Sequence, residues 1–114
     1  MKDKYYKGKI GYCDGTGLGL NRGHYVYIRN CINGNCEINT FTSLKDNDAH
    51  YEIGKIRRIE NGSIYPVPKN DVDLRLFSGV DNRIIKNVPV NKIRIIKKKR
   101  IKSRHKFYIN KYMK

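Results

Sequence analysis

The 114-residue chain is long enough for one domain with a modest core that needs neither disulfides nor a metal. Its 15 Ile and nine Tyr, against one Ala and five Leu, favour strands and argue against a helical protein. Its formal net charge is +15, and no stretch resembles a transmembrane span or a signal peptide, so we expect a cytoplasmic protein with a polyanionic partner.

The first half of the chain alternates short apolar stretches with turn signals. Residues 7–12 are strand-like, and residues 24–30 alternate cleanly between two faces. Asn33-Gly34 is the strongest short signal for a hairpin turn, and residues 36–43 are expected to return antiparallel. This half therefore predicts a three-stranded antiparallel unit.

The second half continues the strand pattern less cleanly. Residues 51–59 and 63–67 are strand-like, and Pro66 and Pro68 confine the latter to an edge of the sheet or end it there. Residues 69–82 fit either a strand or a short helical turn. Residues 84–96 predict one strand or two, with the break near the proline at position 89.

Five to seven short strands in about 90 residues predict a mainly β fold over residues 1–96, either a small antiparallel barrel or a pair of curled sheets. A basic tail follows over residues 97–114, with seven Lys/Arg in its first ten positions. Such a run is disordered or loosely helical when free. Ile101, Tyr108 and Tyr112 lie near helical spacing and favour a short helix docked on the barrel; alternatively, the aromatic residues of the tail stack on bases.

The positive charge lies at one end of the chain. Residues 1–81 hold 12 Lys/Arg and 10 Asp/Glu, whereas residues 82–114 hold 13 Lys/Arg and no acid. Nucleic acid is the usual partner of such a one-sided field, and an acidic membrane fits less well because no clear amphipathic helix accompanies it. A solubilising appendage is the plainer interpretation. If the tail binds nucleic acid, the expected contacts are Lys97, Lys98, Lys99, Arg100, Lys102, Arg104, Lys106 and Tyr108.

Three cysteines, Cys13, Cys31 and Cys36, make an odd number in a chain expected to be cytoplasmic, so free thiols are the default. Cys31 and Cys36 flank the predicted turn, which also permits a bridge or half a metal site. We expect two partly buried thiols. The three histidines are far apart in the sequence and lack ligand spacing, so no metal or cofactor is expected.

A candidate catalytic site lies at one end of the predicted hairpin. Arg22 ends a glycine-rich loop directly before the strand that begins at His24, and Thr42 and Ser43 close the returning strand. Counted from the turn, paired positions sum to 67, which sets Tyr25 opposite Thr42. The pattern gathers a guanidinium, an imidazole and two hydroxyls.

This set of side chains suits RNA cleavage. Arg22 would hold the scissile phosphate and stabilise its extra charge. His24 would move a proton near neutral pH, and a hydroxyl would position the phosphate or the ribose 2′-OH. The alternative is structural: Arg22 is a solvated loop residue, and His24, Thr42 and Ser43 only begin and end strands.

The order KGKIGY, glycine-rich loop, Arg22, apolar strand and a strand ending in Thr42-Ser43 resembles the MazF/PemK-type toxins over residues 5–45. Members of that family are SH3-like barrels that cut single-stranded RNA without metal, usually dimerise, and are neutralised by an acidic antitoxin. The resemblance implies that Arg22 is the catalytic arginine and Thr42 its partner. The chain departs from the family pattern at Gly23, where a proline is usual, and lacks the usual Glu-Gln pair in the loop.

A second resemblance points to the same architecture and a different function. Residues 7–11, KGKIG, are similar to the KOW element of ribosomal proteins and transcription factors, which binds RNA. The first hypothesis is therefore a toxin-like endoribonuclease. The alternatives are a non-catalytic DNA- or RNA-binding barrel, for instance of a mobile element, and a basic inhibitor that binds a nucleoprotein complex.

Overall fold

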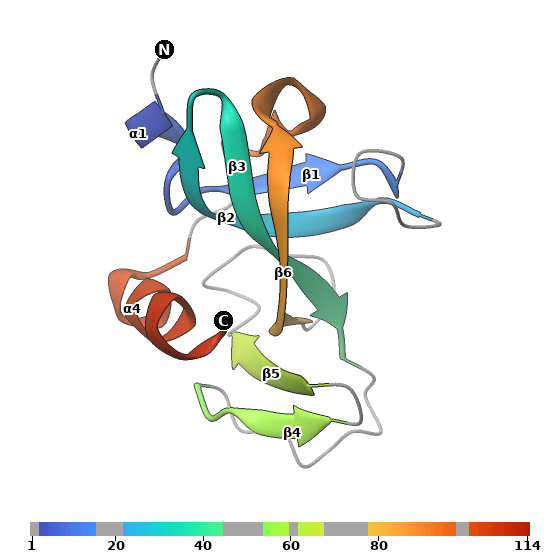
Figure 1. Ribbon diagram of the computed structural model, residues 1–114. Coiled ribbons are helices and arrows are strands. Elements are labelled where there is room, and N and C mark those ends of the chain that lie inside the picture. The colour runs from blue at the N-terminus through green and yellow to red at the C-terminus, as the bar shows by residue number, and fades with distance from the viewer. Residues whose placement is uncertain (1–2, 16–21, 45–53, 60–61, 68–77, 98–100) are drawn as a thin grey trace.

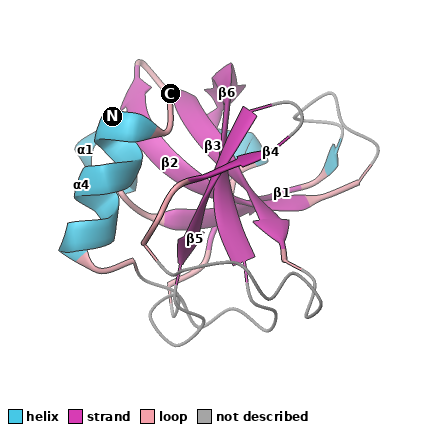
Figure 2. Cartoon of the chain, turned by 90° about the horizontal axis from the view of Figure 1, so that it is seen from below, coloured by secondary structure: helices cyan, strands magenta, loops and turns pink. Residues whose placement is uncertain are grey.

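The computed structural model describes residues 3–15, 22–44, 54–59, 62–67, 78–97 and 101–114. The described residues form one antiparallel sheet in the order β4-β5-β6-β3-β2-β1-β7, with helices at both ends of the chain (Figure 1, Figure 2). This confirms the predicted fold class, a small, mainly β antiparallel structure with a helical C-terminus. The elements are α1 (Asp3–Tyr6), β1 (Ile10–Cys13), β2 (His24–Ile32), β3 (Asn35–Ser43), β4 (Arg57–Ile59), β5 (Gly62–Val67), β6 (Ser78–Pro89), η1 (Val90–Lys92), β7 (Arg94–Ile95) and α4 (Ser103–Tyr112).

Three predictions concern segments that lie partly or wholly outside the described residues. These are the glycine-rich loop before Arg22, the beginning of the predicted strand over residues 51–59, and most of the ambiguous stretch over residues 69–82. The end of that stretch belongs to β6, which begins at Ser78. In the described residues β4 and β7 are the two edge strands of the sheet, and no pairing between them is present.

The β2–β3 hairpin turns at Asn33 and Gly34, as predicted. Both residues have positive φ angles, 52° and 81°, which a two-residue turn between twisted strands requires. Asparagine and glycine tolerate this conformation better than other residues, so the turn is encoded locally.

The predicted register holds only near that turn. The pairs from Asn30 to the turn sum to 67, but Ile28 pairs with Ile38 and Val26 pairs with Thr40. The register therefore shifts by one at Arg29, where β2 bulges. A bulge places one extra residue in one strand, and counting from the turn alone misses it.

Proline marks the ends of two pairings. Pro66 of β5 lies beyond the last β4 pair, at Ile64, and pairs with Gly79 of β6. Because β4 and β6 flank β5 in the sheet, the predicted edge position was wrong for the strand as a whole. Along the chain, β6 ends at Pro89 and a 3-10 turn leads into β7, which confirms the break predicted there.

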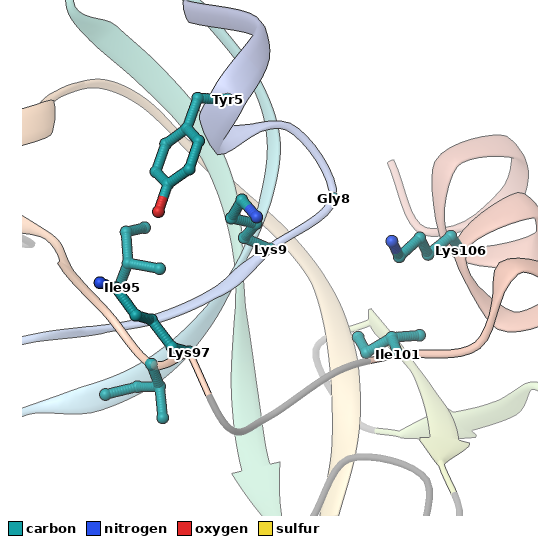
Figure 3. Close-up of a pocket in the computed structure, with 8 residues that line it drawn as sticks. Tyr5, Gly8, Lys9, Ile95, Lys97, Ile101 and Lys106 are labelled. Carbon is teal, nitrogen blue, oxygen red and sulfur yellow. The ribbon is translucent and has the colours of Figure 1, made fainter. Parts of the chain in front are cut away.

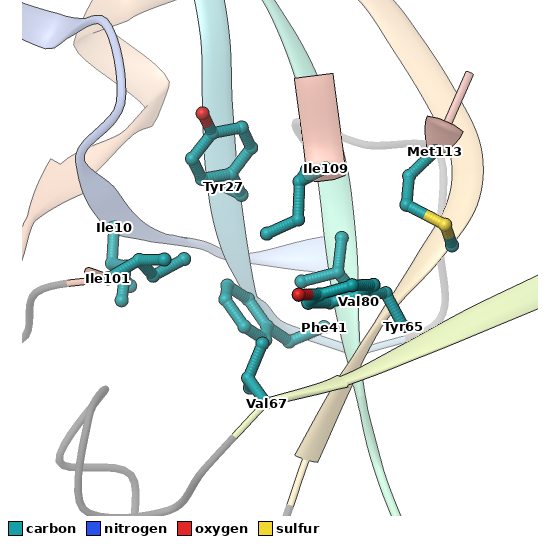
Figure 4. Packing of buried hydrophobic residues seen from close by; sticks show 9 residues of the cluster. All are labelled: Ile10, Tyr27, Phe41, Tyr65, Val67, Val80, Ile101, Ile109 and Met113. Atoms are coloured by element: carbon teal, nitrogen blue, oxygen red, sulfur yellow. The ribbon is translucent and has the colours of Figure 1, made fainter. Parts of the chain in front are cut away.

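Both faces of the central strands are buried. Along β2, Val26 and Ile28 enter one cluster and Tyr27 enters the other, as the predicted alternation requires. The first cluster lies between the sheet and α4 (Figure 4): Ile10, Tyr27, Phe41, Tyr65, Val67, Val80, Ile101, Ile109 and Met113. The second lies on the other face: Cys13, Val26, Ile28, Cys31, Cys36, Ile38, Val88 and Ile93.

Of the residues predicted to seat a C-terminal helix on the sheet, Ile101 is buried in the core, whereas the other buried positions of α4 and its ends differ from the prediction. The buried positions are Ile101, His105, Ile109 and Met113, which recur every four residues on one face. Tyr108 and Tyr112, which the sequence interpretation placed against the barrel beside Ile101, are exposed instead. Docking of a helix is confirmed, but Tyr112 does not belong to the buried face, and Tyr108 contributes only through its stack on Tyr65 of β5.

Arg29 fixes the C-terminal end of α4. Its Nη1 donates to the carbonyl oxygens of Ile109 and Met113, at 3.1 and 3.0 Å, and its Nη2 donates to that of Asn110 at 2.8 Å. The last carbonyls of a helix have no partner within the helix and carry the negative end of its dipole. The buried Arg29 guanidinium, at the β2 bulge, donates hydrogen bonds to these carbonyls and places a positive charge at the negative end of the helix dipole. Asn39 supports it by accepting from Nη1 at 2.9 Å.

The cysteine prediction needs a correction. Cys31 and Cys36 face each other across the hairpin, in register, and are joined by a disulfide rather than present as free thiols. Their Cα atoms are 4.0 Å apart, because the two-residue turn holds opposite positions together. Cys13 is the free cysteine and is buried. Burial, and secondarily Asp14, raise the pKa of its thiol to about 11.

Among the described residues, no helix combines the length and apolar character needed to cross a lipid bilayer.

Candidate nucleic-acid interface

The predicted catalytic residues lie at the end of the sheet where β2 begins and β3 ends. Arg22 is exposed two positions before β2, and His24 is the first residue of that strand. The His24 Nδ1 atom lies 3.4 Å from the carbonyl oxygen of Phe41, the residue before Thr42. The histidine and the end of β3 are therefore neighbours, as the hairpin predicted. The side chain of Ser43 lies outside the described residues.

The hydroxyl of Thr42 is bound within the fold. It donates to Asp81 Oδ2 at 3.2 Å, and the hydroxyl of Thr40 donates to the same oxygen at 2.6 Å. Asp81 is 6% exposed, and its partner Arg83 reaches it at 3.5 Å. A carboxylate next to Thr42 repels an incoming phosphate, so this hydroxyl is poorly suited to bind one.

Sequence reasoning missed Asp81 because a bulge in β6 brings it to β3. Asn39 pairs with Ile84 and Phe41 pairs with Val80, so three residues of β6 lie opposite the single residue Thr40. Asp81 closes the bulge on itself by accepting a hydrogen bond from the Arg83 backbone N–H at 2.9 Å. An aspartate followed by a polar residue gives no strong signal of such a bulge.

A second surface lies on the outer side of α4. Phe107, Tyr108 and Tyr112 are 57%, 42% and 49% exposed. The rings of Tyr108 and Tyr112 stack with centroids 5.8 Å apart and planes 19° from parallel. Tyr108 also stacks on Tyr65 of β5, at 6.2 Å and 21°. Three tyrosine rings thus form a ladder that begins in the core and ends in solvent.

Cations accompany these rings. The Lys111 Nζ atom lies 5.3 Å from the centroid of the Tyr112 ring and 5.5 Å from that of Phe107. Arg104 lines a hollow of about 300 Å³ at the buried end of the ladder, together with Tyr65 and Tyr108. We call this surface the aromatic face; its members are Tyr65, Arg104, Phe107, Tyr108, Lys111 and Tyr112.

The buried end of the ladder is fixed by a hydrogen-bonded pair. The Tyr65 hydroxyl lies 2.7 Å from His105 Nδ1, on the buried side of α4. Burial raises the pKa of Tyr65, with the nearby Tyr108 adding to the rise and Arg104 opposing it. Tyr65 is therefore a neutral phenol at physiological pH and anchors the exposed tyrosines.

No protein-family model matches the chain, and neither a curated protein nor a solved structure is significantly similar to it.

The predicted nucleic-acid contacts are distributed unevenly over this region. Lys97, Lys102, Arg104 and Tyr108 are exposed, Lys106 is half-buried on the other flank of α4, and Lys98 to Arg100 lie outside the described residues. The predicted contacts omitted Phe107, Lys111 and Tyr112. The four-residue spacing of Ile101, His105, Ile109 and Met113 is the signal that would have assigned these three to the exposed side.

Among the described residues, no three His, Cys, Asp or Glu side chains lie close enough together to hold a metal ion.

Proposed function

We propose that the protein binds single-stranded nucleic acid, RNA in the first place, with the aromatic face of α4. The observation that carries this proposal is the exposed ladder of Tyr108 and Tyr112, with Phe107 beside it and cations interleaved. Aromatic rings accept unpaired bases by stacking, and lysine and arginine neutralise the phosphates between them. Every base has a π-face, so a platform of this kind binds many sequences.

The rigidity of α4 supports the proposal. A stacking platform gains affinity when its rings are ordered before the ligand arrives, because less entropy is lost on binding. Here the buried face of α4, the Arg29 hydrogen bonds and the Tyr65 anchor hold the helix in place. The charge of +13 over residues 82–114 adds attraction for a polyanion from any direction.

Fluorescence anisotropy with a labelled 12-nucleotide oligouridine tests the proposal. Tyr108→Ala is expected to weaken binding about tenfold or more, because one stacked base contributes roughly 1–3 kcal/mol. Tyr25→Ala is the matched control, since Tyr25 is a similarly exposed tyrosine on β2, outside the aromatic face. Its affinity should stay within about twofold of the wild type.

Two further measurements test whether the ligand is held by its phosphates and by unpaired bases. Affinity should fall as salt rises, because each neutralised phosphate releases a counterion. A duplex of the same sequence should bind more weakly than the single strand, because its bases are not free to stack. Equal loss of affinity in the Tyr108 and Tyr25 variants would reject the aromatic face, and preference for an oligothymidine would reassign the ligand to DNA.

A second proposal is the endoribonuclease activity expected from the toxin resemblance. The observation that favours it is the proximity of His24 to the end of β3, with Arg22 exposed just before it. Incubation with single-stranded RNA and EDTA should then give cleavage, and Arg22→Ala should abolish it. Cleavage that persists in the Arg22 variant removes the assignment, and intact RNA leaves binding as the activity. The engagement of Thr42 by Asp81 is why cleavage comes second.

A further inference from the structure

A cleft lies on the opposite flank of α4 from the aromatic face. At 100° per residue, Lys106 and Tyr108 are about 160° apart around the helix, so the two surfaces do not overlap. The cleft has a volume of about 600 Å³, within the range of sites for small ligands. Figure 3 shows its walls: Tyr5, Gly8, Lys9, Ile95, Ile96, Lys97, Ile101 and Lys106.

Three lysines line this cleft, and none of the eight described residues around it is acidic. Lys106 reaches from α4 toward the turn at Gly8, while Lys9 and Lys97 come from the other wall (Figure 3). The Lys9 ammonium also lies 4.5 Å from the centroid of the Tyr5 ring, which is 45% exposed. Isoleucines supply the apolar part of the lining.

The backbone holds these lysines in place. Gly8 N–H donates to Ile28 O at 2.8 Å and Ile28 N–H donates to Lys9 O at 3.0 Å, so the turn before β1 is pinned to β2. The Ile96 N–H donates to Ile10 O at 3.0 Å, which fixes the chain next to Lys97. Gly8 has a φ of +79°, and a Cβ there would lie 3.3 Å from Lys106 Nζ. Glycine therefore permits both the turn and the close approach of Lys106.

We propose that this lysine cleft binds a phosphomonoester, either of a free nucleotide or of a 5′-phosphorylated nucleic-acid end. A monoester carries close to two negative charges at neutral pH, whereas each phosphodiester of a strand carries one. Three lysines, with no carboxylate among the described residues that line the cleft, favour the more highly charged group. The exposed Tyr5 ring and the isoleucines offer apolar surface to the attached base or sugar.

Isothermal titration calorimetry of the full chain with AMP tests the cleft. We expect AMP to bind at least about tenfold more tightly than adenosine, because the lysines form charge-assisted hydrogen bonds with the phosphate that adenosine lacks. Inorganic phosphate should displace AMP. Lys106→Gln and Lys9→Gln should each lower AMP affinity several-fold, and Lys92→Gln, an exposed lysine outside the cleft, should leave it unchanged. Equal affinity for AMP and adenosine, or equal effects of Lys106→Gln and Lys92→Gln, would overturn the proposal.

Oligonucleotides distinguish the two sources of the phosphate. In the Tyr108→Ala background, which removes a ring of the aromatic face, 5′-phosphorylated and 5′-hydroxyl oligouridines are compared. Tighter binding of the phosphorylated strand supports a nucleic-acid end, and AMP binding with no such difference supports a free nucleotide. The comparison of AMP with adenosine and the Lys106 and Lys9 variants report on the phosphate in the cleft rather than on base stacking, so the cleft and the proposed RNA binding can fail separately.

Discussion

The end of the β2–β3 hairpin and the C-terminal helix α4 use their side chains in opposite ways. At the hairpin end, the Thr42 hydroxyl donates a hydrogen bond to the buried Asp81, and His24 lies against a backbone carbonyl. On α4, the buried side makes the contacts and the aromatic side faces solvent. Polar groups already satisfied inside a fold have little left for a ligand, whereas exposed stacked rings do. The comparison therefore favours α4 as the binding element.

The strongest test of this comparison is to remove the hydrogen bonds that hold α4 against the sheet. Arg29→Ala removes three hydrogen bonds to helix carbonyls from a side chain that is only 9% exposed. The buried carbonyls would lose their partners, so we expect the free energy of unfolding to fall by about 3 kcal/mol or more. Urea denaturation measures the loss, and amide hydrogen exchange should show α4 opening before the sheet.

Arg83→Ala is the matched control for Arg29→Ala. Its guanidinium is 54% exposed and 3.5 Å from the Asp81 carboxylate, so its removal should cost under about 1 kcal/mol. If both arginine variants lose the same stability, the Arg29 hydrogen bonds do not hold the helix. RNA affinity should fall in the Arg29 variant alone, because the aromatic face depends on α4.

The disulfide tests whether hairpin stability and RNA binding are separate properties. Replacing both Cys31 and Cys36 with alanine opens a short covalent loop, and we expect a loss of about 2 kcal/mol in the free energy of unfolding. Reduction of the wild type with dithiothreitol should produce a similar loss. RNA affinity should not change below the unfolding transition, whereas a parallel loss of affinity would place the hairpin tip in the interface.

Thr42 separates the structural and catalytic interpretations of the hairpin end. Thr42→Val removes its hydrogen bond to Asp81, so we expect about 1 kcal/mol of destabilisation and unchanged RNA affinity. Thr40→Val should cost more, because its 2.6 Å bond to the same carboxylate is buried. Loss of RNA cleavage in a Thr42 variant of full stability would instead restore the catalytic assignment.

The sequence predicted those parts of the fold that depend on local signals. Asn33-Gly34 specified its turn because its positive φ angles need these residue types, and Pro89 marked the end of β6. The two bulges were not predictable, because their energies come from distant partners: Arg29 binds α4, some 80 positions away, and Asp81 binds Thr40, 41 positions away. The expected catalytic site inherited the resulting error in register.

The cysteine prediction failed for a related reason. The turn brought Cys31 and Cys36 into register, which is the geometry for a bridge, but the expected cytoplasmic location weighed against one. The expected location gives only an average preference for free thiols over disulfides, whereas the turn itself sets which two residues lie opposite each other. The local geometry was the more reliable guide.

The smallest expected effect concerns Cys13, which contrasts with the disulfide pair. Because burial raises the pKa of this thiol to about 11 from its ordinary value of 9.0, its thiolate at pH 8 is about 100-fold scarcer than in an unfolded chain. Iodoacetamide should therefore modify Cys13 slowly in the native protein and rapidly in urea, as mass spectrometry of unreduced samples would show. The unfolded chain loses this proton more readily, so the contribution of Cys13 to stability should decline as pH rises above about 9. Rapid native modification would mean that the sheet opens around β1, and the rigid scaffold assumed for α4 would then be wrong.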